Sequence, residues 1–306
     1  TDFPKVTAPT EYNGLGFDYK WDMGFMNDTL RFFQTAPVYR PYDYHKLSFS
    51  MMYFYNEKFL LPFSHDEVVH GKKTILDKMW GSYEDKFSQA KLLYTYMFTH
   101  PGKKLNFMGN ELGHFREWDE KRELDWNLLE YPMHDSFKRF IDDLNGFYLN
   151  SPVLYKNEYS RTGHKWIQAD DTEKCVYVYE RIYGDEKIVI FLNTYCDNYE
   201  NYSVKFDDSV QLELILNTDW QKYGGKSEEV PELIDSIDLY HQDAGHLYSR
   251  NTYSPHGDVK YTTFENPKHL SKKERLRDML YDGTGRYIFR LYQSWSHFGP
   301  THSMFI

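Results

Sequence analysis

The sequence predicts an α/β part followed by an all-β part. Two short apolar runs lie in the first half, at residues 59–63 and 105–108, and segments with helical spacing follow them. Apolar runs without alternation suit strands that are buried on both faces, as in parallel sheets covered by helices. After Ser151 and Pro152 the chain changes to short β-rich runs, which are typical of an antiparallel sandwich.

The first half holds four predicted helices. Apolar side chains recur at helical spacing in residues 22–33, 86–100 and 135–150, and a helix that follows a loop is expected within residues 42–55. Asp43 is a plausible N-cap of the second helix, and Ser82 or Asp85 of the third. Residues 1–20 and 112–131 are predicted to be loops. This gives two strand–helix units, or three with the opening segment. A closed eight-stranded (β/α) barrel takes ~250 residues. The first half is therefore too short to be a complete barrel.

The second half is predicted to be a β domain over residues 153–225. Five short runs rich in β-branched and aromatic residues are the expected strands: 166–168, 175–181, 187–192, 202–206 and 212–216. Residues 226–306 stay unassigned, apart from a charged helix expected at 270–281. Four histidines of this tail are too irregularly spaced for a recognisable metal site, so they are interpreted as surface residues: His241, His246, His256 and His269.

Composition excludes several classes of protein. The 41% hydrophobic content permits a core, and the net charge of −10 argues against a nucleic-acid partner. No apolar run reaches 18 residues, so no membrane span is expected. Cys175 and Cys196 are the only two cysteines, which favours a reducing cytoplasm. Aromatic residues make up 19%; this suits sugar recognition, and equally a core or an interface.

Ionisable residues cluster at the end of the run 59–63. His65, Asp66 and Glu67 follow it directly, and loops after the carboxyl ends of parallel strands carry the chemistry in (β/α) barrels. A solvated turn with a helix N-cap explains the cluster equally well. A zinc site does not fit, because His65 and His70 are five residues apart and the zinc motif needs four. No metal is therefore expected.

A second carboxylate stands in the corresponding place after the run 105–108. Glu111 follows Gly109 and Asn110 there. A structural ion pair or a hydrogen bond to the loop backbone is favoured over a part in the site. Trp21, in the opening segment, could stack on a sugar or serve as a partly buried anchor, and the sequence does not decide between these two roles.

Four motifs in one order carry a family resemblance. Residues 64–73, which read Ser-His-Asp-Glu-Val-Val-His-Gly-Lys-Lys, resemble the signature of glycogen (1,4-α-glucan) branching enzymes in the α-amylase superfamily. Residues 14–30 and 101–111 are similar to other segments of that family. The triplets Arg116-Glu117-Trp118 and Leu124-Asp125-Trp126 fit the loop after the last barrel strand. The resemblance covers roughly residues 1–225 and fails from about Lys226 onward.

The resemblance implies a fold and a reaction. Residues 1–152 would be the C-terminal part of a (β/α)8 TIM barrel, residues 153–225 a C-terminal antiparallel β-sandwich, and residues 226–306 a divergent tail. The reaction would be a retaining transfer of an α-1,4 glucan chain to a 6-hydroxyl, which forms α-1,6 branches in glycogen biosynthesis. The family's third Asp and the His before it match Asp66 and His65.

The resemblance also implies partners. Glycogen, amylose and amylopectin would be the substrates, without any cofactor, and the groove would hold five side chains that bind the glucan: Trp21, Glu67, Glu111, Trp118 and Trp126. The nucleophile and the general acid are expected upstream of Thr1, in a missing N-terminal part of the enzyme. This chain alone is therefore expected to be inactive.

Two alternatives remain. Another glucan hydrolase of the α-amylase superfamily is less compatible with residues 68–73 and with Lys20-Trp21. A non-catalytic glucan-binding protein that uses the aromatic loops is the other alternative, and it would keep its affinity for amylopectin without Asp66.

Overall fold

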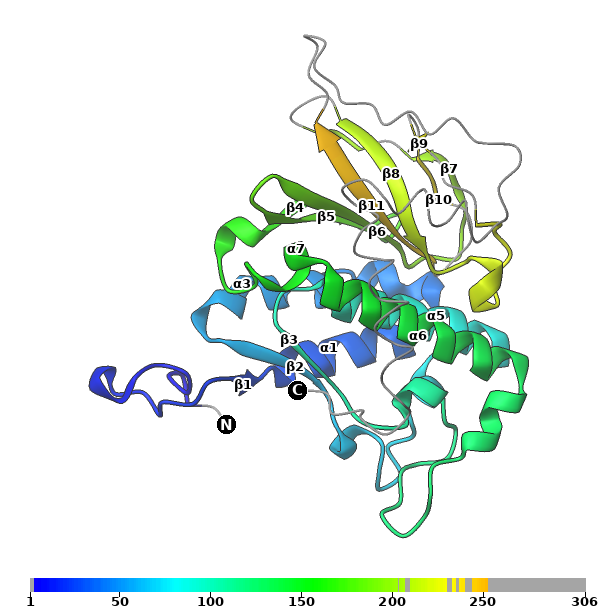
Figure 1. Ribbon diagram of the computed structural model, residues 1–306, viewed down its shortest axis with the longest axis horizontal. Helices are drawn as coiled ribbons and strands as arrows, with labels where there is room; N and C mark the ends of the chain where they lie inside the picture. The colour runs from blue at the N-terminus through cyan, green and yellow to red at the C-terminus, as the bar shows by residue number, and fades with distance from the viewer. Residues whose placement is uncertain are drawn as a thin grey trace.

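The computed structural model describes residues 3–202, 204–206, 210–229, 233–234, 237–239 and 244–252 (Figure 1). The helix expected at 270–281 and three of the tail histidines, His241, His256 and His269, lie outside these residues. No helix of the described part is long and apolar enough to cross a membrane.

A three-stranded parallel sheet forms the centre of the α/β part. Its order is β1 (Lys20–Trp21), β2 (Phe59–Phe63), β3 (Lys103–Asn106), and both pairings are parallel. All five residues of β2 are buried, as expected for a central strand covered on both faces. β3 begins and ends two residues before the predicted run 105–108, because residues Lys103 to Asn106 are those that pair with β2. Lys103 and Lys104 find polar partners there, so the strand tolerates them.

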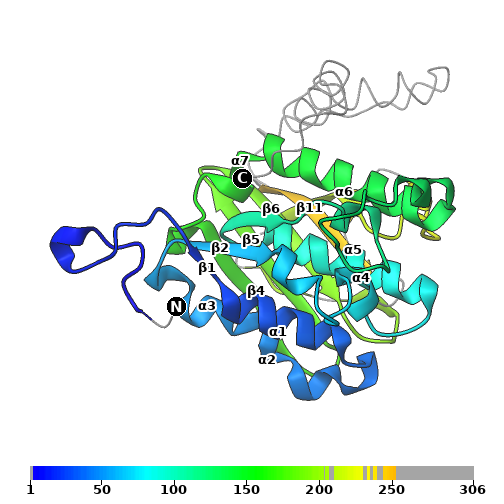
Figure 2. The same ribbon diagram turned by 90° about the horizontal axis from the view of Figure 1, so that it is seen from below.

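Three long helices cover this sheet. They are α1 (Met23–Gln34), α5 (Tyr83–Thr99) and α6 (Pro132–Asn150). Asp22 caps α1 by accepting the Phe25 N–H at 2.9 Å, and Ser82 with Asp85 forms a capping box at α5. Figure 2 shows α1 on one side of the β1–β2 pair and α6 on the other. The sequence therefore located these helices, with their starts displaced by one to three residues.

The predicted helix at 42–55 is wrong in its continuity. The segment is divided into η2 (Pro37–Asp43), α2 (His45–Ser48), α3 (Ser50–Tyr53) and η3 (Phe54–Asn56). The Ser48 hydroxyl bonds back to the His45 carbonyl oxygen at 3.4 Å, directly before the break between α2 and α3. The other short helices are α4 (Ile75–Lys78), α7 (Pro152–Tyr155), η1 (Thr10–Tyr12), η4 (His65–Glu67), η5 (Asn110–Leu112), η6 (Trp126–Glu130), η7 (Arg161–Gly163) and η8 (Gln221–Tyr223).

The β part contains a six-stranded and a two-stranded antiparallel sheet. The larger sheet has the order β4 (His164–Asp171), β5 (Val176–Tyr183), β6 (Glu186–Asn193), β11 (Ala244–Thr252), β8 (Val210–Asn217), β9 (Leu233–Ile234). In the smaller sheet, β7 (Tyr199–Tyr202) pairs with β10 (Ile237–Leu239). The strand predicted at 202–206 is wrong in its position. The strand of this region, β7, ends at Tyr202, and residues 204–206 are not in a strand.

The end of the β part predicted at residue 225 is also corrected. β11 lies between β6 and β8 and pairs with both, so residues beyond 225 supply a central strand. Its sequence, Ala-Gly-His-Leu-Tyr-Ser-Arg-Asn-Thr, lacks the apolar alternation on which the prediction of strands relied.

The α/β part and the larger sheet share one core. Side chains of β5 and β6 that point to α5, such as Tyr177 and Ile190, belong to the same buried cluster as Phe63 of β2. The alternate side chains, such as Val178 and Phe191, pack with Tyr202 of β7 in a second cluster. In Figure 1 the larger sheet accordingly lies over α5.

Buried cations join the two parts. Arg181 of β5 donates to the carbonyl oxygens of Thr99 at 2.7 Å and Leu154 at 3.0 Å. Lys91 of α5 donates to those of Thr218 and Tyr223 at 2.8 and 2.9 Å. These bonds satisfy backbone carbonyl oxygens at or near the ends of helices and strands, which would otherwise be buried without hydrogen-bond partners.

Candidate active site

The carboxyl end of β2 carries His65 and Asp66. Buried Ser64 caps the short helix η4, because its hydroxyl accepts the Asp66 N–H at 3.3 Å. The side chains of His65 and Asp66 are half exposed, and His65 Nε2 lies 3.3 Å from Asp66 Oδ1. The buried strand thus presents a carboxylate and an imidazole together at the edge of the sheet.

Two aromatic rings flank this pair. The His65 ring centroid is 5.7 Å from that of Phe107 and 6.3 Å from that of Trp118. Phe107 and Trp118 contact each other edge to face at 5.1 Å. The structure therefore brings His65, Asp66 and Trp118 together, and it adds Phe107, which follows β3 and which the sequence did not single out.

Glu117 fastens the turn that follows Asp66. Its carboxylate accepts the Gly71 N–H at 2.9 Å and the Lys73 N–H at 2.6 Å. These two backbone donors hold the pKa of Glu117 below its usual range. The turn has three residues with positive φ: His70 at 60°, Gly71 at 78° and Lys73 at 67°. Such a backbone needs outside support, and Glu117 provides it.

Two lysines hold the backbone around Glu67. Lys78 Nζ donates to the carbonyl oxygens of Glu67 and Lys73, and burial lowers the pKa of Lys78 to about 8. Lys72 Nζ donates to the Asp66 carbonyl oxygen at 2.7 Å. Both ammonium groups bind carbonyl oxygens.

Glu111 is engaged with its own loop. Its carboxylate accepts the Gly109 N–H at 2.8 Å, which is the backbone hydrogen bond that the sequence left open as an alternative. Burial raises the pKa of Glu111, and its charged neighbours are Lys138 and Asp142 of α6. The Glu111 side chain therefore lies between its own loop and α6, where it contacts the loop backbone and faces charged residues of the helix.

Trp21 and Trp126 stand apart from the His65 cluster. Trp21 ends β1 and pairs with Leu60, three residues before the end of β2. Trp126 begins η6. Their side chains are 41% and 49% exposed, and within the described residues neither makes a ring contact with His65 or Trp118.

The loop after β3 is closed by an ion pair between two of the sequence motifs. Arg116 donates to both carboxylate oxygens of Asp125, from Nε at 2.9 Å and from Nη2 at 2.8 Å. The pKa of Asp125 is lowered by this bidentate pair. His114 Nδ1 lies 3.3 Å from the same carboxylate. The sequence placed both residues in this loop, within two motif triplets, but did not predict the ion pair between them.

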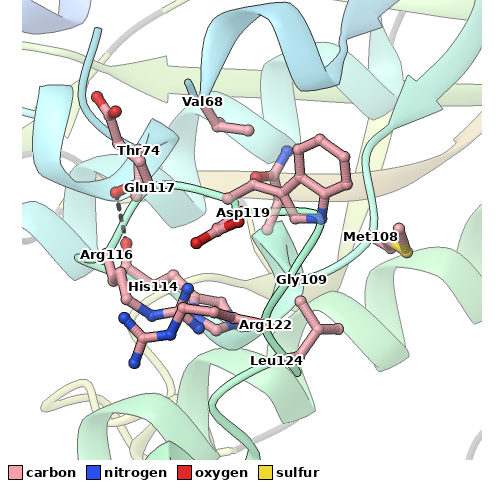
Figure 3. Close-up of a pocket in the computed structure, with 12 residues that line it drawn as sticks. Val68, Thr74, Met108, Gly109, His114, Arg116, Glu117, Asp119, Arg122 and Leu124 are labelled. Carbon is pink, nitrogen blue, oxygen red and sulfur yellow. Dashed lines mark hydrogen bonds between the residues drawn. The ribbon is translucent and has the colours of Figure 1, made fainter. Parts of the chain in front are cut away.

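This loop and the turn after Asp66 enclose a small pocket (Figure 3). Trp118 lines it beside Val68, and the Trp118 N–H donates to the Val68 carbonyl oxygen at 3.0 Å. Thr74 Oγ1 donates to the His114 carbonyl oxygen from the opposite side. Trp118 therefore belongs both to the lining of this pocket and to the His65 cluster, and the two hydrogen bonds tie the loop to the turn. Among the described residues, no group of three His, Cys, Asp or Glu side chains is placed to hold a metal ion.

Comparisons with solved structures show the fold. The structure of an AmyP variant in complex with maltotriose matches with a TM-score of 0.54 at 14% identity, over 78% of this chain and 51% of that chain. The alpha-amylase from H. orenii matches with a TM-score of 0.52 at 15% identity, over 82% of this chain and 52% of that chain. Residues 166–251 match the family model of the alpha amylase C-terminal all-beta domain.

Comparisons with curated proteins show the relatives. The 1,4-alpha-glucan branching enzyme of Bacillus cereus is 45% identical over 251 residues, which are 81% of this chain. That of Bacillus anthracis is 44% identical over the same share. The chain spans 39% of the length of these relatives. Over 81% of its residues, the chain is thus a homologue of part of the 1,4-alpha-glucan branching enzymes.

Proposed function

We propose that this chain is part of a 1,4-alpha-glucan branching enzyme and that it contributes Asp66 and His65 to the transfer site. The observation that carries the proposal is the 45% identity to such enzymes, together with the half-exposed carboxylate and imidazole at the carboxyl end of a buried parallel strand. Active sites of (β/α) barrels lie at that end.

Asp66 stabilises the transition state in this proposal. A sugar ring that is losing its leaving group develops positive charge, and a fixed negative charge beside it lowers the energy of the transition state more than that of the ground state. The His65 ring, 3.3 Å from Asp66 Oδ1, orients the carboxylate and shares a hydroxyl of the same sugar. The nucleophile and the acid of the retaining reaction come from the remaining part of the enzyme.

The aromatic side chains form the glucan groove. Trp118 stands next to His65 and offers a ring to the sugar at the transfer site. Trp21 and Trp126, both well exposed, bind glucose units further along the chain. Glu67 completes the polar edge. Glu111 supports the loop that carries Trp118.

In this proposal, residues 1–152 are the C-terminal part of a (β/α)8 barrel and the sheets after residue 153 are a β-sandwich domain. Three adjacent parallel strands with covering helices fit part of such a barrel. The tail beyond the last described strand stays unassigned. Glycogen, amylose and amylopectin are the proposed substrates, and the cytoplasm is the proposed location.

The test is an iodine–amylose assay with detection of α-1,6 linkages. The 306-residue chain alone is expected to be inactive, and mixing or co-expression with the remaining portion of a Bacillus branching enzyme is expected to restore branching. Activity of the chain alone would place the missing carboxylates within it. Hydrolysis without new α-1,6 linkages would favour a glucan hydrolase, and binding without any reaction would favour a glucan-binding protein.

A further inference from the structure

His114 is buried in the loop that carries Trp118. It is 8% exposed, and its carbonyl oxygen accepts the Thr74 hydroxyl. Its ring nitrogen Nδ1 lies 3.3 Å from Asp125 Oδ2. Because an ionised carboxylate only accepts hydrogen bonds, the proton of the neutral ring belongs on Nδ1, and Nε2 carries a lone pair.

The other ring nitrogen is closed off from solvent and from polar groups. Among the described residues, Nε2 of His114 is a buried atom without a hydrogen-bond partner. It faces Gly109, because a Cβ added to that glycine would lie 3.4 Å from Nε2 and 2.9 Å from Leu124 Cδ2. A lone pair is tolerated in such surroundings, whereas a charged N–H group without an acceptor is strongly disfavoured. The closed loop therefore excludes the protonated form of His114.

The charges around the ring offset one another. Asp125 favours a positive charge on His114, but Arg116 already occupies both oxygens of that carboxylate, at 2.9 and 2.8 Å. Arg116 itself and His134 of α6 oppose a positive charge on the ring. Burial is the largest effect, and it lowers the pKa of His114 below 6.5. Three further charged side chains line the pocket beside the ring (Figure 3): Glu117, Asp119 and Arg122.

Trp118 joins this loop to the transfer site. Its N–H donates to the Val68 carbonyl oxygen at 3.0 Å, and its ring centroid lies 6.3 Å from that of His65. If the loop opened around His114, this hydrogen bond would be released and the Trp118 ring would leave His65. In the open loop both nitrogens of His114 would reach water, and the ring would titrate at its ordinary pKa of 6.5.

We infer that His114 is a positioning residue, which keeps the Trp118 loop closed while it is neutral and opens the loop when it takes up a proton. The opening follows from the loop's own contacts, whereas its effect on glucan transfer rests on the proposed function. The open form binds one proton more than the closed form, so the closed loop has its full stability above pH 6.5 and loses stability as pH falls. Between pH 7 and pH 5 the ratio of open to closed loop rises by up to about 25-fold, the limit for a closed form that takes up no proton.

The test is hydrogen exchange of the Trp118 amide in the 306-residue chain at pH 7 and pH 5, measured by mass spectrometry and corrected for the intrinsic pH dependence of exchange. On acidification, the opening equilibrium of the wild type is expected to rise by about tenfold or more. His114→Asn keeps a donor near the position of Nδ1 and takes up no proton, so its equilibrium is expected to change by about threefold or less. His45→Asn, at an exposed histidine of α2, is the matched control and should behave like the wild type. The shifted groups His100 and Glu111 are present in all three proteins, so their effects cancel in the comparison.

The branching rate of the reconstituted enzyme is the second readout. The ratio of kcat at pH 5.5 to kcat at pH 7 is expected to be higher in His114→Asn than in His45→Asn, because only the second variant can open its loop by protonation. Circular dichroism checks that each variant is folded. If His114→Asn does not fold, His114→Gln takes its place, since it also carries no titrating group.

The outcomes separate the two proposals. An equal pH dependence of exchange in the wild type, His114→Asn and His45→Asn would overturn the inference, whatever the branching assay gives. Loop opening that depends on His114, in an enzyme that forms no α-1,6 linkages, would support the loop's response to acid and contradict the proposed function. Loop opening with equal kcat ratios in the two variants would show that closure of the loop does not position the site.

Discussion

Glu117 acts on the site without belonging to it. Its two oxygens accept the N–H groups of Gly71 and Lys73 and fix a turn of unfavourable backbone conformation directly after Asp66. Glu117→Gln keeps one acceptor and turns the other into a donor that faces an N–H, so one backbone donor loses its partner at a cost of about 1–3 kcal/mol. The expected result is a fall of about tenfold or more in kcat, with KM changed less.

The measurement is branching kinetics in the reconstituted enzyme. Glu120→Gln, at an exposed carboxylate of the same loop, is the control and should match the wild type. Equal kcat values for the two variants would show that the turn does not need this clamp. Glu117→Asp, which retains both oxygens on a shorter arm, should recover part of the rate.

The positions of His65 and Asp66 could be predicted from sequence because a buried strand ends there, whereas the role of Glu117 could not. Its partners are 44 and 46 residues earlier in the chain. They lie in a turn with three positive φ angles, and only one of these three residues, Gly71, is a glycine, so the sequence does not indicate the turn's conformation. Glu111 shows the reverse case. Its place after a strand was predicted, and burial and Gly109 decide what it does there.

At the scale of the element, the residue that follows α5 is a buried histidine that must stay neutral. His100 is 1% exposed; its Nδ1–H donates to the Pro101 carbonyl oxygen at 2.7 Å, and its Nε2 accepts the Ser50 hydroxyl at 2.8 Å. Burial holds the pKa of His100 well below 6.5. As pH falls below 6.5, the unfolded chain takes up this proton and the folded chain does not, so the free energy of unfolding decreases by up to about 1.4 kcal/mol per pH unit.

Urea unfolding at pH 7 and pH 5 measures this effect. His100→Gln, which carries no titrating group, should be less stable than the wild type at pH 7 and should lose less stability on acidification. Parallel losses in the two proteins would mean that His100 does not titrate differently on folding.

Elements were predictable where one pattern dominated. The fully apolar β2 followed from its unbroken apolar run, and the long helices followed from their apolar spacing. Ser82, one of the two N-cap candidates, is the N-cap of α5. β3 and β11 were displaced or missed because pairing partners, and not their own side chains, make them strands. β1, with two residues, depends wholly on its neighbour β2.

At the scale of the whole molecule, the two parts that composition separates at Ser151 are one packed body. Tyr177 and Ile190 of the larger sheet share a core with the helices, and Arg181 bonds across the junction. A change in composition marks where the type of secondary structure changes, and it does not report how much apolar surface the two sides bury against each other. The two-part organisation could therefore be predicted, and the shared core could not.

The most direct test of the account is α-1,6 linkage formation by the reconstituted enzyme with Asp66→Asn in this chain. Asp185→Asn, in the exposed turn between β5 and β6, is the control and should branch like the wild type. The account predicts that Asp66→Asn lowers the rate by about a hundredfold or more while glucan binding persists, as is usual when one preorganised charge at the transition state is removed. Branching near the wild-type rate would contradict the role of Asp66 and with it the assignment of the transfer site.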